Sequence, residues 1–132
     1  MAAFKYNNYR SESAEGTMVW TAMNVKIALV NSSYVGDPTD VYLSEVNGIV
    51  KISGSFTSKT VLDGYARGLC PEILLFRDGA EITGVVLFDD TGDPNTSKLI
   101  AYIDDGTGLP FTPVGFDYTI AYDASLGGWF RL

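Results

Sequence analysis

The sequence predicts a single-domain, all-β protein built from antiparallel strands, either a sandwich or a barrel. Short apolar segments of strand length alternate with turn clusters rich in Gly, Asp, Pro and Asn at near-regular spacing. No long helical pattern separates them, so a βαβ arrangement is excluded. The chain has 132 residues, 46% of them hydrophobic, which fits one domain with a sizeable core.

The clearest strand pattern covers residues 23–30. Met23, Val25, Ile27 and Leu29 occupy alternate positions, as in a half-buried strand. Aromatic and aliphatic residues also alternate with polar ones from Phe116 onward, and the closing apolar segment is expected to be buried or paired. Further strands are predicted at residues 49–57, 60–62, 72–77, 82–88, 98–104, 116–123 and 129–132.

Two local signals refine this pattern. Asp78-Gly79 lies between two apolar segments and predicts a β-hairpin that pairs residues 72–77 with residues 82–88. Asp37 followed by Pro38 is typical of a helix N-cap and first helical position. The sequence therefore predicts one short helix there, and no other.

Residues 1–16 form a separate N-terminal segment, and residues 17–132 form the β domain. The segment shows neither helical nor strand periodicity, yet it carries Phe4, Tyr6 and Tyr9, which are unusual in a disordered tail. It is either an arm that docks on a partner, a frayed tail or a first edge strand.

Composition excludes several kinds of function. The chain has no histidine, so Ser-His-Asp triads and His-ligated metal sites cannot form. The single cysteine, Cys70, can form no internal disulfide and is expected to fill apolar space. Nine basic residues are scattered among 16 acidic ones, which argues against nucleic acid as a partner. No apolar run approaches the ~18 residues of a membrane span. No secretion signal is visible in the N-terminal residues, so a protein made and used without secretion is expected.

The acidic loop at residues 89–95 is the best candidate for a metal site. Asp89, Asp90 and Asp93 supply oxygen atoms at short spacing, but no EF-hand pattern is present, and turn formation explains them better. Carboxylate-pair hydrolysis would need Asp117 and Glu72 to face one another across a cleft. We therefore expect no enzyme, no cofactor and no catalytic residue.

Three aromatic residues fall outside the strand pattern. Trp20, Tyr34 and Tyr65 either fill the core, anchor a protein interface or, if exposed together on a flat face, stack on sugars. The last alternative would make the protein a carbohydrate-binding module for host adhesion.

Several segments resemble a family of small virion proteins from tailed bacteriophages. The similarity lies in residues 25–34, 88–92 and 96–104, then in the Phe-Asp-Tyr-Thr-Ile strand at 116–120 and the closing Trp-Phe-Arg-Leu at 129–132. It is a shared pattern of strands and turns from Val25 to Leu132, without a diagnostic motif.

The resemblance implies an antiparallel β-sandwich of jelly-roll type, with at most one short helix and an extended N-terminal arm. It also implies a capsid decoration (cement) protein that is made in the host cytoplasm and lies on the capsid exterior of the virion. Such a protein binds the major capsid protein, and itself as a homodimer or homotrimer. Other members of such families sit at the neck or tail. The residues expected to contact a partner are Phe4, Tyr6, Tyr9, Trp20, Tyr34 and Tyr65.

Overall fold

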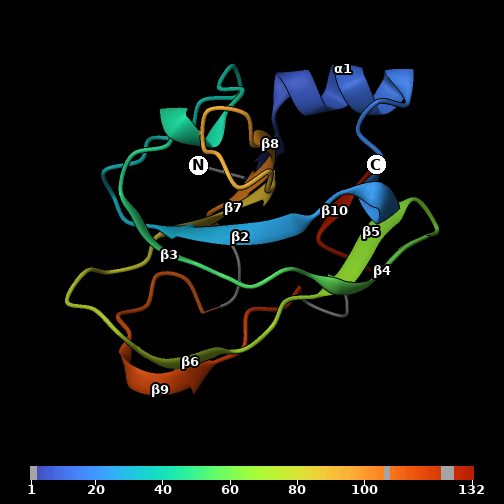
Figure 1. Ribbon diagram of the computed structural model, residues 1–132. Helices are drawn as coiled ribbons and strands as arrows, with labels where there is room; N and C mark the ends of the chain where they lie inside the picture. Colours follow the sequence, from blue (N-terminus) through green and yellow to red (C-terminus); the bar gives the residue numbers. More distant parts are fainter. Residues whose placement is uncertain (1–2, 106–107, 123–126) are drawn as a thin grey trace.

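The computed structural model describes residues 3–105, 108–122 and 127–132. In these ranges antiparallel strands form three sheets that pack together, with one α-helix against them (Figure 1). This confirms the predicted all-β sandwich. The strands are β1 (Phe4–Lys5), β2 (Val25–Val30), β3 (Ile49–Ile52), β4 (Thr57–Leu62), β5 (Tyr65–Leu69), β6 (Ile73–Arg77), β7 (Gly84–Asp89), β8 (Lys98–Ile103), β9 (Val114–Tyr118) and β10 (Phe130–Arg131). The helical segments are α1 (Asn7–Glu15) and the 3-10 turns η1 (Trp20–Ala22) and η2 (Leu43–Glu45).

The main sheet has the strand order β1-β8-β7-β2-β3 and is buried on both faces. In β2, Val25, Ile27 and Leu29 face one hydrophobic cluster, while Ala28 and Val30 face another. The sequence predicted a half-buried strand, with polar Lys26 opposite the apolar face. Lys26 is the second residue of β2, and the strand beyond it is apolar on both sides.

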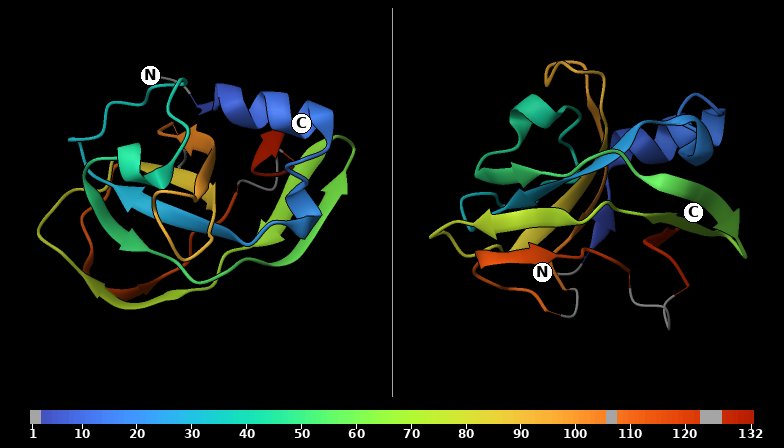
Figure 2. Two further views of the ribbon diagram at one scale, coloured as in Figure 1. Left: turned by 45° about the horizontal axis from the view of Figure 1, so that its top comes forward. Right: turned by 60° about the horizontal axis from the view of Figure 1, so that its bottom comes forward.

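A second layer covers one face of the main sheet (Figure 2). It consists of a three-stranded sheet, β10-β5-β4, and a two-stranded ribbon, β6-β9. Ile73 and Phe76 of the ribbon and Ala66 of β5 share one hydrophobic cluster with β2 and β7. The other face is covered by the 31–48 segment, through Tyr34, and by Tyr6. Sheets of five, three and two strands differ from the eight-stranded double sheet of a jelly roll.

The C-terminal segment is paired, as predicted. Phe130 lies opposite Ala66 in the β10–β5 pair, and the backbone N–H of Leu132 donates to the Gly64 carbonyl at 2.7 Å. Trp129 is buried, and its indole N–H donates to the Gly68 carbonyl at 3.0 Å. The chain end thereby completes the three-stranded sheet.

The prediction of an extended N-terminal arm is wrong. Residues 7–15 form α1, and Tyr6 and Tyr9 are 0% and 1% exposed. The physical reason is that burying both aromatic rings in the core stabilises the folded chain, whereas an extended arm would leave them in water. The backbone also holds the segment in place, because the Tyr6 N–H donates to the Ile100 carbonyl at 3.0 Å. Tyr9 is the only buried residue of the helix, so the segment carries no amphipathic pattern. No helix in the described ranges has the length and apolar character needed to cross a membrane.

The short helix expected after Asp37 does not form. Asp37 instead accepts a hydrogen bond from the Thr39 N–H at 2.9 Å, which closes a local turn. Beyond it, Tyr42 forms a β-bridge with Lys98 and draws the chain onto β8. Only the single turn η2 remains helical in this segment.

The predicted hairpin at Asp78-Gly79 is also wrong. The Ala80 N–H donates to the Asp78 carboxylate at 2.8 Å, so a turn is present, but the two flanking strands do not pair. β6 pairs with β9, whereas β7 pairs with β2 and β8. Strand β7 is apolar on both faces and requires a central place in the main sheet, while β6 has one exposed face.

Tyr9 holds α1 against the body of the protein, and its ring lies edge-on to Phe130 at 5.7 Å. Replacing Tyr9 by Ala should lower the free energy of unfolding by about 3–5 kcal/mol, because a fully buried aromatic ring is lost. Urea unfolding followed by circular dichroism measures this. Arg10→Ala, an exposed position one residue further on, is the matched control. Equal stability of the two variants would show that α1 is not docked in solution.

Glu12 of α1 forms an ion pair with Lys98 of β8, with Oε1 2.8 Å from Nζ. This contact, together with the hydrogen bonds that Asn8 and Thr17 donate, holds the pKa of Glu12 below its ordinary value. A carboxyl group whose pKa is lowered by folding stabilises the native state above its unfolded pKa and ceases to do so as the pH falls through the folded value.

Glu12→Gln should therefore destabilise the protein by about 0.5 kcal/mol at pH 7, as expected of a partly exposed ion pair. The difference from wild type should shrink as the pH falls below the ordinary glutamate pKa of about 4.3, because the unfolded chain then binds a proton more readily than the ion-paired Glu12 does. Melting temperatures of both proteins between pH 7 and pH 3 test this. A difference that stays constant over that range contradicts the ion pair's role.

Candidate functional site

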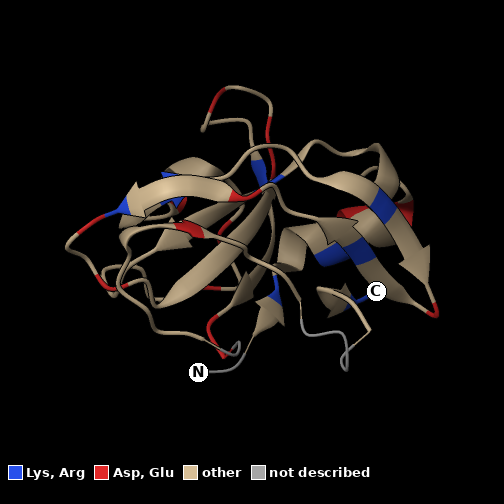
Figure 3. Ribbon diagram, turned by 90° about the horizontal axis from the view of Figure 1, so that it is seen from below, with Lys and Arg blue, Asp and Glu red and all other residues tan. Residues whose placement is uncertain are grey.

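Four of the twelve exposed large apolar residues in the described ranges lie on one element, the two-stranded ribbon β6–β9. Leu74 and Leu75 of β6 are 64% and 78% exposed, and Val114 and Phe116 of β9 are 54% and 69% exposed. These four residues are called the ribbon surface below. In the view from below, the layer that carries them lies nearest the viewer (Figure 3). Several exposed apolar side chains on one element are typical of an interaction site.

A bulge in β6 produces half of this surface. Its pairing with β9 shifts between Ile73 and Phe76, so the two intervening leucines both face outward. Leu75 has a φ of 49°, a left-handed conformation that costs about 1 kcal/mol for a residue with a Cβ atom. The Leu75 N–H donates to the Asp117 carboxylate at 2.9 Å, which supports the bulge. Ile73 and Phe76, on either side, are each 5% exposed and point into the core.

A second irregularity in β9 produces the other half. Gly115 has a φ of 104°, and the register shifts again between Phe76 and Arg77. Phe116 is exposed, although it lies opposite the buried Phe76 in the ladder. Bulges re-aim side chains at sheet edges and beside functional sites. Register shifts also occur between β2 and β3, β4 and β5, and β7 and β8.

Charged residues frame the apolar part of β6. Glu72 precedes the strand and Arg77 ends it, and both are exposed. Among the described residues, neither takes part in an ion pair. Because of the bulge, the outward face of this strand reads Glu72, Leu74, Leu75, Arg77.

A cavity of about 800 Å³ lies between the main sheet and the chain near its C-terminal end. Its walls are apolar and aromatic, with Phe111, Tyr118, Tyr122 and Trp129 among them. Asp105 is the only acidic residue among the described lining residues. Carboxylate-pair hydrolysis needs two facing carboxyl groups, and the described lining of this cavity supplies one.

Glu72 and Asp117, the two carboxylates set apart by the sequence, have other contacts. Asp117 holds the β6 bulge through the Leu75 N–H. Glu72 accepts a 3.5 Å hydrogen bond from the Thr119 hydroxyl at the exposed surface. Neither lines the cavity among the described residues.

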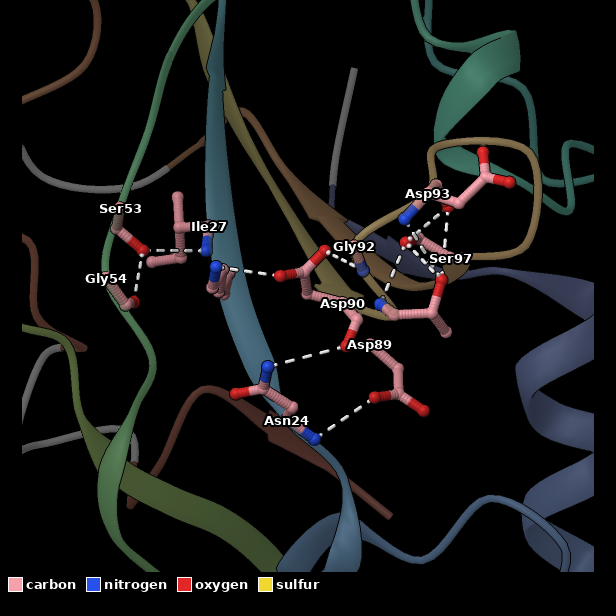
Figure 4. Close-up of polar contacts among 11 residues, drawn as sticks. Asn24, Ile27, Ser53, Gly54, Asp89, Asp90, Gly92, Asp93 and Ser97 are labelled. Atoms are coloured by element: carbon pink, nitrogen blue, oxygen red, sulfur yellow. Dashed lines mark hydrogen bonds and ion pairs between the residues drawn. The ribbon is translucent and has the colours of Figure 1, made fainter.

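The carboxylates of Asp89 and Asp90 accept hydrogen bonds from their own loop and from the chain at the start of β2 (Figure 4). Asp89 accepts from the Asn24 N–H at 3.0 Å, and Asp90 accepts from the Gly92 N–H at 3.0 Å. Lys26 lies 2.7 Å from Asp90 and lowers the pKa of that carboxyl group. These contacts connect the loop to β2.

Asp93 has the same role further along the loop. Its carboxylate accepts from the Asn95 N–H at 2.9 Å, and its carbonyl accepts from the Ser97 hydroxyl at 2.9 Å. Within the described part of the chain, no three Asp, Glu or Cys side chains come together as a metal would need. The loop residues thus act as turn formers.

Four of the six residues expected to contact a partner lie in the core. Tyr6 and Tyr34 share a buried hydrogen bond of 2.6 Å between their hydroxyl groups, and burial raises the pKa of both. Trp20 is 2% exposed and donates to the Arg67 carbonyl at 2.8 Å, and Tyr9 is equally buried. These side chains are not on the surface that a partner could reach.

The other two, Phe4 and Tyr65, are half-buried. Phe4 packs against Tyr6 and Tyr102, and Tyr65 lies in β5 opposite Arg131. They lie in different sheets. Cys70 is buried as predicted, and desolvation raises the pKa of its thiol, so it is a packing residue.

The sequence did not reveal the ribbon surface. Residues 73–76 are four apolar residues in a row, a pattern that fits a strand buried on both faces. Only the flanking Glu72 and Arg77 hinted at an exposed side. Which of the four residues face outward depends on the bulge, and no sequence pattern marks its position.

Comparison with known protein families, with characterised proteins and with solved structures finds no match to this chain.

If Leu75 is kept for its outward side chain, its removal should not harm the fold. Leu75→Gly should leave the free energy of unfolding of the dilute protein unchanged or raise it by up to about 1 kcal/mol, because glycine adopts positive φ without strain. Phe76→Ala, the buried neighbour, should lower it by about 3–5 kcal/mol. Urea unfolding of both variants measures the contrast. A large loss in Leu75→Gly would mean that Leu75 is a core residue.

Proposed function

We propose that the protein is a structural subunit of a virus particle, which acts by binding other protein subunits and stabilises a capsid from outside. The observation that carries this proposal is the ribbon surface. Bulges in both of its strands turn four large apolar side chains toward solvent, at the expense of a strained backbone at Leu75. Selection for stability alone would favour burial or a polar residue there.

The chemistry of the described residues is consistent with a binding role. The chain has no histidine, and the carboxylates of its acidic loop are engaged in turn hydrogen bonds and an ion pair. The large cavity has apolar walls and a single described acid. Nothing in this arrangement supports general acid-base or nucleophilic catalysis.

The sugar-binding alternative loses the platform on which it depended. Trp20 and Tyr34 are 2% and 6% exposed and belong to different hydrophobic clusters. Tyr65 alone is partly accessible, and one ring offers little stacking area for a sugar. The position on the head, rather than at a neck or tail, follows only from the resemblance to decoration proteins.

The proposed mechanism is mechanical. A packed capsid is under outward pressure, and a subunit that bridges neighbouring capsid proteins adds contacts that must break before the shell opens. A single contact of modest area binds weakly. Several contacts made by one assembly bind far more tightly, because each holds the others at high effective concentration.

The proposal predicts co-sedimentation of the purified protein with empty heads of tailed bacteriophages, at a fixed stoichiometry. The double variant Leu74→Ser, Phe116→Ser should bind at least about tenfold more weakly, because it removes the apolar centre of the ribbon surface. Binding is read from the pelleted fraction over a range of protein concentrations.

Val35→Ser is the matched control, since Val35 is 82% exposed but lies in the loop after β2. It should bind heads as wild type does. Absence of binding by wild type to any head, or equal binding by the ribbon variant, would overturn the proposal as stated.

A further inference from the structure

The outward face of β6 is self-complementary. Its four outward residues run from acidic Glu72 through Leu74 and Leu75 to basic Arg77. About the point between the two leucines, each leucine corresponds to the other. At the same distance from that point on either side lie two long side chains of opposite charge, Glu72 and Arg77. We infer that the ribbon surface binds the same surface of a second copy of this chain, around a twofold axis through that point. This inference rests on the proposed role as an assembly subunit. The ribbon surface joins two copies, and a ribbon variant binds heads weakly because a single copy makes only one capsid contact instead of two.

A twofold axis makes every contact occur twice. In such an interface residue i touches residue j, and residue j touches residue i. With the two β6 strands antiparallel, Leu74 of each copy meets Leu75 of the other. Glu72 meets Arg77 of the second copy at both ends, about 8 Å from the axis at the usual strand rise. Both groups are free to pair, because neither has an ion-pair partner among the described residues.

The size of the surface suits this partner. The exposed parts of the four apolar side chains amount to roughly 500 Å² on each copy, near the upper end for a patch on a monomer. A standard interface covers about 800 Å² per partner, with an apolar centre and a polar rim. The ribbon surface supplies the centre, and Glu72 and Arg77 supply part of the rim.

Charge selects this partner and this orientation. Each copy carries a net charge of −7, so two copies repel one another unless opposite charges meet locally. Antiparallel β6 strands give two Glu72–Arg77 pairs, whereas parallel strands would set like charges against one another. Such an arrangement steers register and orientation.

Sedimentation velocity over about 1–500 μM tests the inference on the full chain. Wild type should form a dimer with a Kd in the micromolar range. Glu72→Arg and Arg77→Glu should each raise the Kd by about tenfold or more, since each sets like charges together twice. The double variant Glu72→Arg, Arg77→Glu restores both pairs and should dimerise like wild type.

Mixing the two single variants should also restore association. Every pair across the axis is then Arg against Glu, so the mixture should form heterodimers while each variant alone stays monomeric. Glu15→Arg and Arg10→Glu make the same charge changes on the exposed face of α1 and should dimerise normally. Circular dichroism and melting temperature confirm that each variant folds.

A wild type that remains monomeric up to about 500 μM would overturn the inference. So would a dimer that neither single variant weakens, because another surface would then form it. Failure here is distinct from failure of the proposed function. A monomer that still sediments with empty heads refutes only the dimer, and a dimer that binds no head refutes only the virion role.

Discussion

The main sheet is buried on both faces, and the rest of the structure follows from this constraint. Strand β7 is buried at every residue except its last, and β2 at every residue except Lys26. A sheet of this kind must be covered on two sides by a chain of only 132 residues. Four other parts of the chain pack against its two faces: the N-terminal segment, the 31–48 segment, the β4–β5 hairpin and the C-terminal residues.

At one side, the layer that covers the main sheet consists only of the two-stranded ribbon β6–β9. Two strands suffice to bury Ile73 and Phe76 against the main sheet, but a two-stranded ribbon has marginal stability by itself. Its outer face would ordinarily be polar. Here it is apolar, and the bulges that turn Leu75 and Phe116 outward are held by specific contacts such as that of Asp117. The same element therefore closes the core on one side and offers a binding surface on the other.

The charged residues divide into two groups with different roles. The first group forms two ion pairs. Glu12 with Lys98 connects α1 to the main sheet, and Asp90 with Lys26 connects the acidic loop to it. Glu72 and Arg77 lie at the ends of β6 without an ion-pair partner in the described ranges. The first group supports the fold. The second is left to set the orientation of a partner, which is the usual contribution of charge at an interface.

The sequence by itself determined the fold class, most of the strands and the burial of Cys70 and Trp129, because alternation and turn residues act locally. It also excluded histidine-based chemistry. The tertiary structure alone decided that Tyr6 and Tyr9 enter the core, that β6 leaves β7 to pair with β9, and that Leu74 and Leu75 face outward. Those outcomes depend on which distant segments compete for the two faces of one sheet, and on a bulge, neither of which leaves a periodic mark in the chain.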